Sequence, residues 1–176
     1  DEPTKLALAA LQGALYREIG HMLAQPLTAD TFHMTLHGLV NGPAYTEALV
    51  GDMARVKDVV LPLLETWQSE PPLSMRATRT FNLVHTSVVL GLEPSDAGSW
   101  RQLDQMYQAL EAVVPLGYGL TPHITLAYYK PGAYSEADAA RLRAALGPSD
   151  LEMILPMQAL AYQTFWDMNH YRAEAT

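Results

Sequence analysis

Two short stretches with one pattern constrain this chain more than any other feature. The first reads Phe-His-Met-Thr-Leu-His from residue 32, and the second reads Pro-His-Ile-Thr-Leu-Ala from residue 122. Successive side chains of an extended strand point to opposite faces, so His33 shares a face with Thr35, and His123 shares a face with Thr125. Each stretch therefore predicts a strand whose polar face lines a cleft and whose apolar face seals a core. Two such strands predict a symmetric polar site.

Size and composition limit the architecture and the setting. At 176 residues and 49% hydrophobic content, the chain suits a single domain over residues 1–176, as one compact body or as two small lobes that share a core. No apolar stretch approaches the roughly 20 residues of a membrane span, and residues 1–5 do not resemble a signal peptide. We therefore expect a cytoplasmic protein without a membrane partner. Cysteine is absent, which excludes disulfides, a thiolate nucleophile and cysteine-ligated metals.

The formal net charge of −8 indicates which partners suit the chain. Binding along a nucleic-acid duplex draws its affinity from basic patches that displace counterions, and the sequence has no basic cluster. It also has no Walker-type glycine-rich loop and no dinucleotide fingerprint. A nucleotide or short oligonucleotide phosphodiester is therefore a better candidate partner than long duplex nucleic acid.

Hydrophobic spacing and turn residues predict alternating helices and strands. Pro62 lies inside one apolar helical pattern, which predicts a kink or a division into two helices. Ser99 is the expected N-cap of a later helix, and Ser135 with Asp138 resembles a capping box. In chain order we expect a helix at 5–24, a strand at 32–40, a helix at 45–67, a hairpin of strands 78–84 and 86–92, a helix from Ser99 to Pro115, a strand at 121–129, a helix at 135–147 and a strand at 153–162.

This element order indicates an α+β fold rather than a doubly wound parallel sheet. A helix precedes each motif strand, and another helix follows it. The repetition predicts two lobes related by a pseudo-twofold axis, in which two antiparallel sheets form a central cleft flanked by helices.

The residue types of the motifs suit the cleavage of a phosphodiester without a metal. This reaction needs a base that takes a proton from the attacking oxygen and an acid that gives one to the departing oxygen. Histidine serves in both roles, because its unperturbed pKa of about 6.5 leaves both forms accessible near neutrality. Threonine hydroxyls beside the rings donate hydrogen bonds to phosphate oxygens and stabilise the charge that develops on them.

The paired motifs resemble those of the two-histidine (2H) phosphoesterase superfamily, whose members include LigT-like RNA 2′,3′-cyclic phosphodiesterases. The likeness rests on His33-Met34-Thr35-Leu36 and His123-Ile124-Thr125-Leu126, with Pro122 before the second copy, and element order extends it over nearly the whole chain. It implies a bilobal fold with one motif in each lobe, metal-independent chemistry, and a cyclic or 2′-5′ phosphodiester as substrate. Members often begin with a strand before the first helix. Here the helix comes at once, so that strand is either missing or outside the chain.

Four further residues are candidate substrate contacts. Continued alternation puts His37 on the face of the first motif and Tyr129 on the face of the second, and Arg79 and Lys130 are cations near the motifs in sequence. Packing or surface exposure is the alternative role for each. His85 begins a looser His-x-Ser pattern, and its place in the predicted hairpin favours a structural role over that of a cleft neighbour, which stays open.

Three functions are open from the residues. The first is a monomeric, cofactor-free phosphodiesterase in which His33 and His123 are general acid and base while Thr35 and Thr125 hold the phosphate. The second is a module that binds a nucleotide or terminal phosphate without turning it over. The third is a metal-dependent hydrolase in which His33, His37 and His123 bind zinc. The pattern disfavours the third, because it supplies no nearby carboxylate and leaves the threonines unused.

Overall fold

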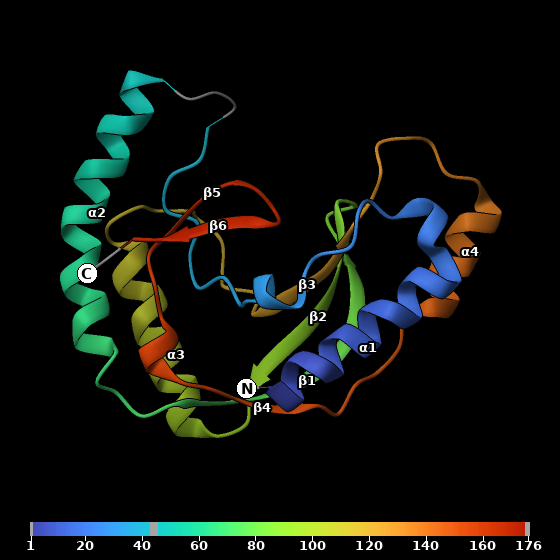
Figure 1. The fold of residues 1–176 in the computed structure, drawn as a ribbon. Helices are drawn as coiled ribbons and strands as arrows, with labels where there is room; N and C mark the ends of the chain where they lie inside the picture. Colours follow the sequence, from blue (N-terminus) through green and yellow to red (C-terminus); the bar gives the residue numbers. More distant parts are fainter. Residues whose placement is uncertain (1, 43–45, 175–176) are drawn as a thin grey trace. The chain divides into compact units, whose positions relative to one another are not determined.

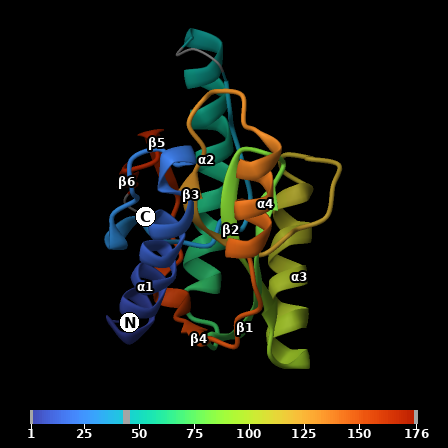
Figure 2. The same cartoon turned by 90° about the vertical axis from the view of Figure 1, so that its right-hand side faces the viewer.

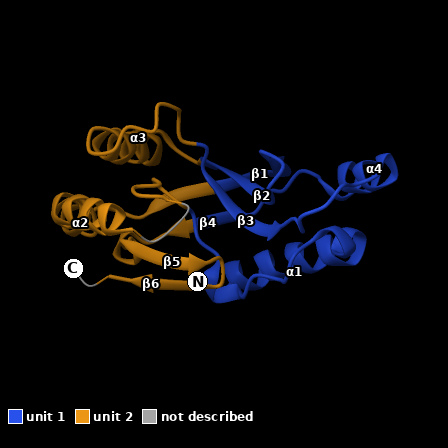
Figure 3. Ribbon diagram, turned by 90° about the horizontal axis from the view of Figure 1, so that it is seen from above, with its two compact units in different colours: residues 1–34, 76–93, 121–153 blue, residues 35–75, 94–120, 154–176 orange. Residues whose placement is uncertain are grey.

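The protein has an α+β fold, seen in a computed structural model that describes residues 2–42 and 46–174 (Figure 1). The chain divides into two compact units, each made of three chain segments (Figure 3). The first unit comprises residues 1–34, 76–93 and 121–153, and the second comprises residues 35–75, 94–120 and 154–176.

The helices and strands are distributed between the two units. The first unit holds α1 (Glu2–Ile19), the 3-10 turns η1 (Gly20–Met22) and η2 (Ala29–Thr31), β3 (His123–Tyr128) and α4 (Glu136–Ala145). It also holds most of β1 (Leu73–Leu83) and β2 (Ser87–Pro94), and it shares β4 (Glu152–Leu155) with the second unit. The second unit holds α2 (Glu47–Trp67), α3 (Ala97–Glu111), the 3-10 turn η3 (Met157–Ala159), β5 (Gln163–Asp167) and β6 (His170–Ala173).

α1 confirms the helix predicted near the start of the chain. Its apolar residues recur at helical spacing, so Leu8, Leu15 and Ile19 fall on one face and are buried. This face packs against β3, and α1 also lies along α4 (Figure 1). α4 begins with the predicted capping box, in which Ser135 and Asp138 satisfy each other's backbone amides.

The main sheet has the strand order β3-β2-β1-β4, and its two middle strands form the predicted hairpin (Figure 2). The turn between β1 and β2 contains Val84 and His85, both with positive φ, at 42° and 60°. The His85 ring lies within hydrogen-bond distance of the Asn82 side chain, 3.0 Å away. His85 is therefore a turn residue, as the hairpin interpretation predicts.

A β-bulge interrupts the pairing of β2 with β3. Val88 pairs with Ala127, but Val89 pairs with Thr125, so Leu126 is one extra residue on β3. The buried side chain of Gln12 on α1 donates hydrogen bonds to the Leu126 carbonyl and to the Leu27 carbonyl, both at 3.0 Å. Gln12 thus satisfies a carbonyl at the bulge and ties α1 to the loop that precedes the first motif.

The first motif does not lie in a regular strand, although a strand was predicted over residues 32–40. Met34 alone forms a β-bridge there, to Ile124, and the chain bends at Leu36. The chain turns away from β3 after this single pair of residues. The β-propensity of residues 32–40 therefore does not produce a ladder of paired residues.

Two helix predictions can be compared with the structure. α2 is one helix of 21 residues with Pro62 inside it, so of the two predicted outcomes, a kink or a division, the division does not occur. Burial of Val56, Val60 and Leu64 along one face offsets the backbone donor that proline removes. α3 begins after Asp96 rather than Ser99, because the Asp96 carboxylate accepts the Ser99 amide at 2.8 Å. The predicted start of the earlier helix, Tyr45, lies outside the described residues.

The end of the chain also differs from the prediction. The strand predicted over 153–162 is only β4, which ends at Leu155 before Pro156, and η3 follows it. Residues 163–173 form a second, two-stranded sheet of β5 and β6, for which no strand was predicted. Among the described residues, no helix combines the length and apolarity that crossing a membrane requires.

Candidate functional site

The second motif lies on β3, the edge strand of the main sheet. One edge of β3 pairs with β2 in antiparallel register, with Gly91 opposite His123 and Val89 opposite Thr125. The other edge is bridged at Ile124 by Met34, which is the central residue of the first motif. The fold therefore brings together two segments 90 positions apart in the sequence.

The isolated bridge between Met34 and Ile124 is antiparallel. In a regular antiparallel ladder this register would set His33 opposite Thr125. Directly opposite residues share a face, and His123 shares that face with Thr125 because they are two residues apart. In such a ladder His33 and His123 would be diagonal neighbours on one face, a relationship with backbone positions about 7–8 Å apart.

Both imidazoles make the same hydrogen bond to the backbone. Nδ1 of His33 lies 2.7 Å from the Thr31 carbonyl oxygen, and Nδ1 of His123 lies 2.6 Å from the Thr121 carbonyl oxygen. A carbonyl oxygen only accepts, so Nδ1 carries the proton in both rings. Nε2 is thereby the nitrogen that gains or loses a proton in each ring.

This shared contact reveals a longer repeat than His-x-Thr-Leu. Thr31 and Thr121 each lie two residues before a motif histidine, so both copies read Thr-x-His-x-Thr-Leu. The sequence interpretation missed these two threonines, although the repeated letters were a signal that an internal alignment of the chain would have found.

Gly91 on β2 lies beside the second motif, on the face of the sheet that carries His123. It lies opposite His123, so a side chain at position 91 would point to the face of the imidazole. A Cβ atom there would lie 2.8 Å from Thr78 Oγ1 and 2.9 Å from Phe81 Cε1. The side chains of Thr78 and Phe81 thus occupy the space beside Gly91. Sequence reasoning missed all three residues, because they come from the hairpin and carry no motif.

Tyr129 does not follow the alternation that put it with Thr125. The extra residue Leu126 shifts the face pattern between these two positions. The Tyr129 hydroxyl is buried and has no hydrogen-bond partner among the described residues, and its ring lies 6.3 Å from that of Tyr134. Burial raises the pKa of Tyr129 to about 12. The geometry is that of a packed side chain, and a substrate contact stays a prediction.

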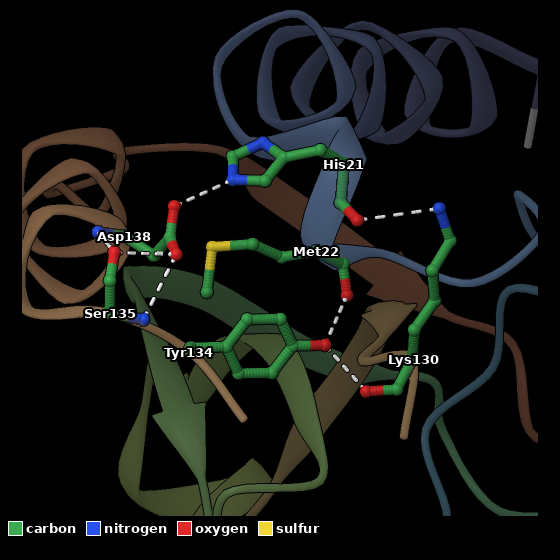
Figure 4. Close-up of polar contacts among 6 residues, drawn as sticks. All are labelled: His21, Met22, Lys130, Tyr134, Ser135 and Asp138. Carbon is green, nitrogen blue, oxygen red and sulfur yellow. Dashed lines mark hydrogen bonds and ion pairs between the residues drawn. The ribbon is translucent and has the colours of Figure 1, made fainter. Parts of the chain in front are cut away.

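Lys130 belongs to a polar cluster that joins η1 to the start of α4 (Figure 4). Its Nζ donates to the His21 carbonyl at 3.4 Å, and His21 Nε2 lies 2.8 Å from Asp138 Oδ1. The hydrogen bond from His21 is the main reason why the pKa of Asp138 falls to about 2. Asp138 is also the capping residue that accepts the Ser135 amide. A substrate contact by Lys130 stays a prediction.

Arg79 lies on β1, which β2 separates from β3. It is exposed and forms a bridge to Pro148, on the side of β1 that faces β4. The order of the strands thus separates its backbone from that of His123, and contact with substrate stays a prediction for this residue too.

His37 belongs to the second unit and is buried there. Its side chain is 0% exposed, and its Nε2 lies 3.2 Å from Glu111 Oε1. The bend at Leu36 breaks the strand alternation on which its predicted alignment with His33 rests. Thr35 is the first residue of the second unit, whereas His33, His123 and Thr125 all belong to the first unit. The unit division therefore differs from one motif in each lobe.

The described residues contain no group of three or more His, Asp or Glu side chains placed to hold a metal ion. Of the three histidines considered from the sequence as zinc ligands, His33 and His123 belong to the first unit and His37 to the second. In both His33 and His123, Nδ1 is engaged by a carbonyl oxygen and is not a metal-ligating nitrogen in this geometry.

Comparisons with known proteins identify the fold. No family model matches the chain, and no curated protein matches it. Among solved structures, the crystal structure of TT0787 from Thermus thermophilus superposes with a TM-score of 0.60 and 18% sequence identity, over 98% of this chain and 90% of that chain. At this identity the likeness is one of fold, and it extends over nearly the whole of both chains.

Proposed function

We propose that this chain is a metal-independent phosphodiesterase of the two-histidine phosphoesterase type, with His33 and His123 as the general acid and base. The observation that carries the proposal is the matched geometry of these residues. They lie on bridged segments, and both use Nδ1 for a backbone carbonyl. A histidine held in this way presents Nε2 for proton transfer. A single histidine with an Nδ1 bond to a backbone carbonyl is common in proteins. Two such histidines, one in each copy of a repeated motif, suit a reaction that needs both an acid and a base.

The proposed reaction is hydrolysis of a cyclic 2′,3′-type or a 2′-5′ phosphodiester. Nε2 of the neutral ring takes a proton from water as the water oxygen bonds to phosphorus. The bond from phosphorus to the leaving ribose oxygen breaks, and that oxygen takes a proton from Nε2–H of the charged ring. Thr35 and Thr125 donate hydrogen bonds to the non-bridging oxygens, whose charge grows in the transition state. The proton balance is restored when the rings exchange protons with solvent.

The proposed substrate is a nucleotide or a short oligonucleotide. The formal charge of −8 disfavours long polyanions, which need many cationic contacts. The proposal also includes a monomeric protein with the bilobal, pseudo-twofold arrangement of the superfamily. The fold shared with TT0787 is compatible with it, but that likeness concerns the fold alone.

Turnover in the presence of a chelator tests the proposal. Wild-type protein, His33→Ala, His123→Ala and His85→Ala should be assayed with 2′,3′-cyclic, 2′-5′ and 3′-5′ phosphodiesters and excess EDTA. We expect wild type and His85→Ala to cleave one class equally, because His85 is a turn histidine of the same unit. Each motif variant should lose about 10²- to 10⁴-fold in kcat, the usual contribution of general acid–base catalysis.

Other results would assign another function. Binding of a cyclic nucleotide without turnover by wild type would identify the non-catalytic binding module. Activity that EDTA abolishes and zinc restores would identify the metal-dependent hydrolase.

A further inference from the structure

A partly buried polar cluster in the second unit surrounds the carboxylate of Glu111, the last residue of α3. Oε1 of Glu111 lies 3.2 Å from His37 Nε2, 3.1 Å from the Tyr107 hydroxyl and 2.9 Å from the Leu116 amide nitrogen. Oε2 accepts the Gly117 amide at 3.4 Å. One carboxylate thus accepts from four donors on three chain segments.

These donors lie close in sequence to both motifs. His37 is two residues after Thr35, on the chain that leaves the first motif. Leu116 and Gly117 precede Thr121, whose carbonyl accepts from the imidazole of His123. The Tyr107 hydroxyl also lies within hydrogen-bond distance of the Tyr118 carbonyl in this second segment, so its single proton is shared between that oxygen and Glu111. The cluster therefore anchors the end of one motif segment and the start of the other on the same helix.

The cluster is suited to hold these segments firmly. A carboxylate only accepts hydrogen bonds and has about four lone-pair sites on two oxygens, whereas a neutral amide has one acceptor oxygen with two lone pairs. The amide of Leu116 is the main reason why the pKa of Glu111 lies below its usual value. His37 is buried, its ring lies 5.4 Å from that of Tyr107, and its Nδ1 has no partner among the described residues.

We propose that Glu111 is a positioning residue for the two-histidine site: it fixes the chain on either side of the motifs through His37 and through the amides of Leu116 and Gly117. This inference rests on the proposed function. Glu111 acts through the backbone that carries the motif residues and touches no substrate. Catalysis by two groups at one phosphorus depends strongly on their spacing, and a misplacement of 1 Å can reduce the rate about 10²-fold.

The primary test compares Glu111→Gln with Glu174→Gln. Glu174 is a matched control in the same unit, since it pairs with Lys57 at 2.8 Å and its side chain is 22% exposed against 19% for Glu111. We expect Glu111→Gln to lower kcat about 10- to 100-fold with little change in KM. Glu174→Gln should leave both parameters unchanged. Equal effects of the two variants on kcat would overturn the inference.

A double variant separates positioning from general stability. In a His123→Ala background the spacing of two rings no longer matters, so Glu111→Gln should lower kcat little further. A purely structural role would reduce the active fraction by the same factor in both backgrounds, and this result would overturn the inference. If Glu111→Gln does not fold, Tyr107→Phe replaces it, because it removes only the hydroxyl that reaches Glu111 and Tyr118.

Hydrogen exchange tests the anchoring independently of turnover. We expect backbone amides of residues 116–123 to exchange faster in Glu111→Gln than in wild type or Glu174→Gln. If wild type cleaves no phosphodiester, the proposed function fails, and this exchange experiment alone decides whether Glu111 anchors the segment. If wild type is active while Glu111→Gln keeps both its kcat and its protection, the function stands and the positioning role is wrong.

Discussion

Met34 and Ile124, the central residues of the two motifs, form an antiparallel β-bridge at the edge of the main sheet. Continued as a regular antiparallel register, this pairing would set His33 opposite Thr125 and both motif histidines on one face. Each imidazole is oriented by the carbonyl two residues before it. Four consequences of this arrangement and of the residues that support it can be measured.

The first prediction concerns the tautomers of the histidines. At a pH where the rings are neutral, His33 and His123 should carry the proton on Nδ1, because each Nδ1 faces a carbonyl oxygen. His37 is an internal control with the opposite tautomer, because its Nε2 donates to the Glu111 carboxylate. Long-range ¹H–¹⁵N NMR spectra distinguish the two forms. A proton on Nε2 of neutral His33 or His123 would contradict the orientation assigned to that ring.

The second prediction concerns Gly91 on β2. Gly91→Ala places a Cβ atom 2.8 Å from Thr78 Oγ1 and 2.9 Å from Phe81 Cε1, on the face of His123. Overpacking of this kind costs about 1–3 kcal/mol. We expect a lower free energy of unfolding in urea together with a lower kcat. Gly51→Ala is the control for adding a methyl group, since nothing lies within 4 Å of a Cβ atom there. If Gly91→Ala had the same free energy of unfolding as wild type, the side chains of Thr78 and Phe81 could not lie as close to position 91 as described.

The third prediction concerns Gln12. Gln12→Ala leaves the carbonyls of Leu27 and Leu126 without the side-chain amide that both now accept from. A buried polar group left unsatisfied costs about 1–3 kcal/mol, so the free energy of unfolding should fall by this amount. Gln102→Ala removes a similar bond, to the Pro71 carbonyl, from an exposed position, and should change stability by less than about 0.5 kcal/mol. Equal losses in the two variants would show that burial at the bulge is unimportant.

The fourth prediction concerns acid stability. The pKa of Asp138 is about 2 in the folded protein against 3.8 ordinarily, chiefly because of its hydrogen bond from His21. A depressed carboxyl pKa stabilises the folded state above the ordinary pKa, and this contribution is lost as the pH falls toward the folded value. Asp138→Asn should therefore unfold at lower urea concentration than wild type at pH 5. The difference between the two proteins should shrink between about pH 4 and pH 2. A difference that is constant over this range would exclude Asp138 as its source.

The sequence predicted the elements whose signals are local. The amphipathic α1, the hairpin of β1 and β2, and the capping box of α4 follow from spacing, turn residues and caps within a few positions. The α+β class follows from their order. The predicted strand over 153–162 was wrong in its end, since β4 stops at Leu155, and α2 continues through Pro62 because one of its faces is buried.

The candidate site was predictable only in part. The motif residues repeat in the sequence, and the bridge from Met34 to Ile124 agrees with the predicted association of the two segments. No sequence pattern predicts the bulge at Leu126 or the bend at Leu36. The bulge changes the face on which Tyr129 lies, and the bend does the same for His37, so the strand alternation assumed for these two residues does not hold. Glu111 was missed because its role depends on contacts between segments distant in sequence.

The central claim is that His33 and His123 act together on one phosphorus, and the kcat of the double variant tests it most directly. Wild type, His33→Ala, His123→Ala and the double variant should be compared with the cleaved phosphodiester under chelator. Groups that act as a unit are strongly non-additive, so we predict that the double variant loses about as much activity as either single variant. Losses that multiply in the double variant, or a single variant that keeps the wild-type kcat, would contradict the account.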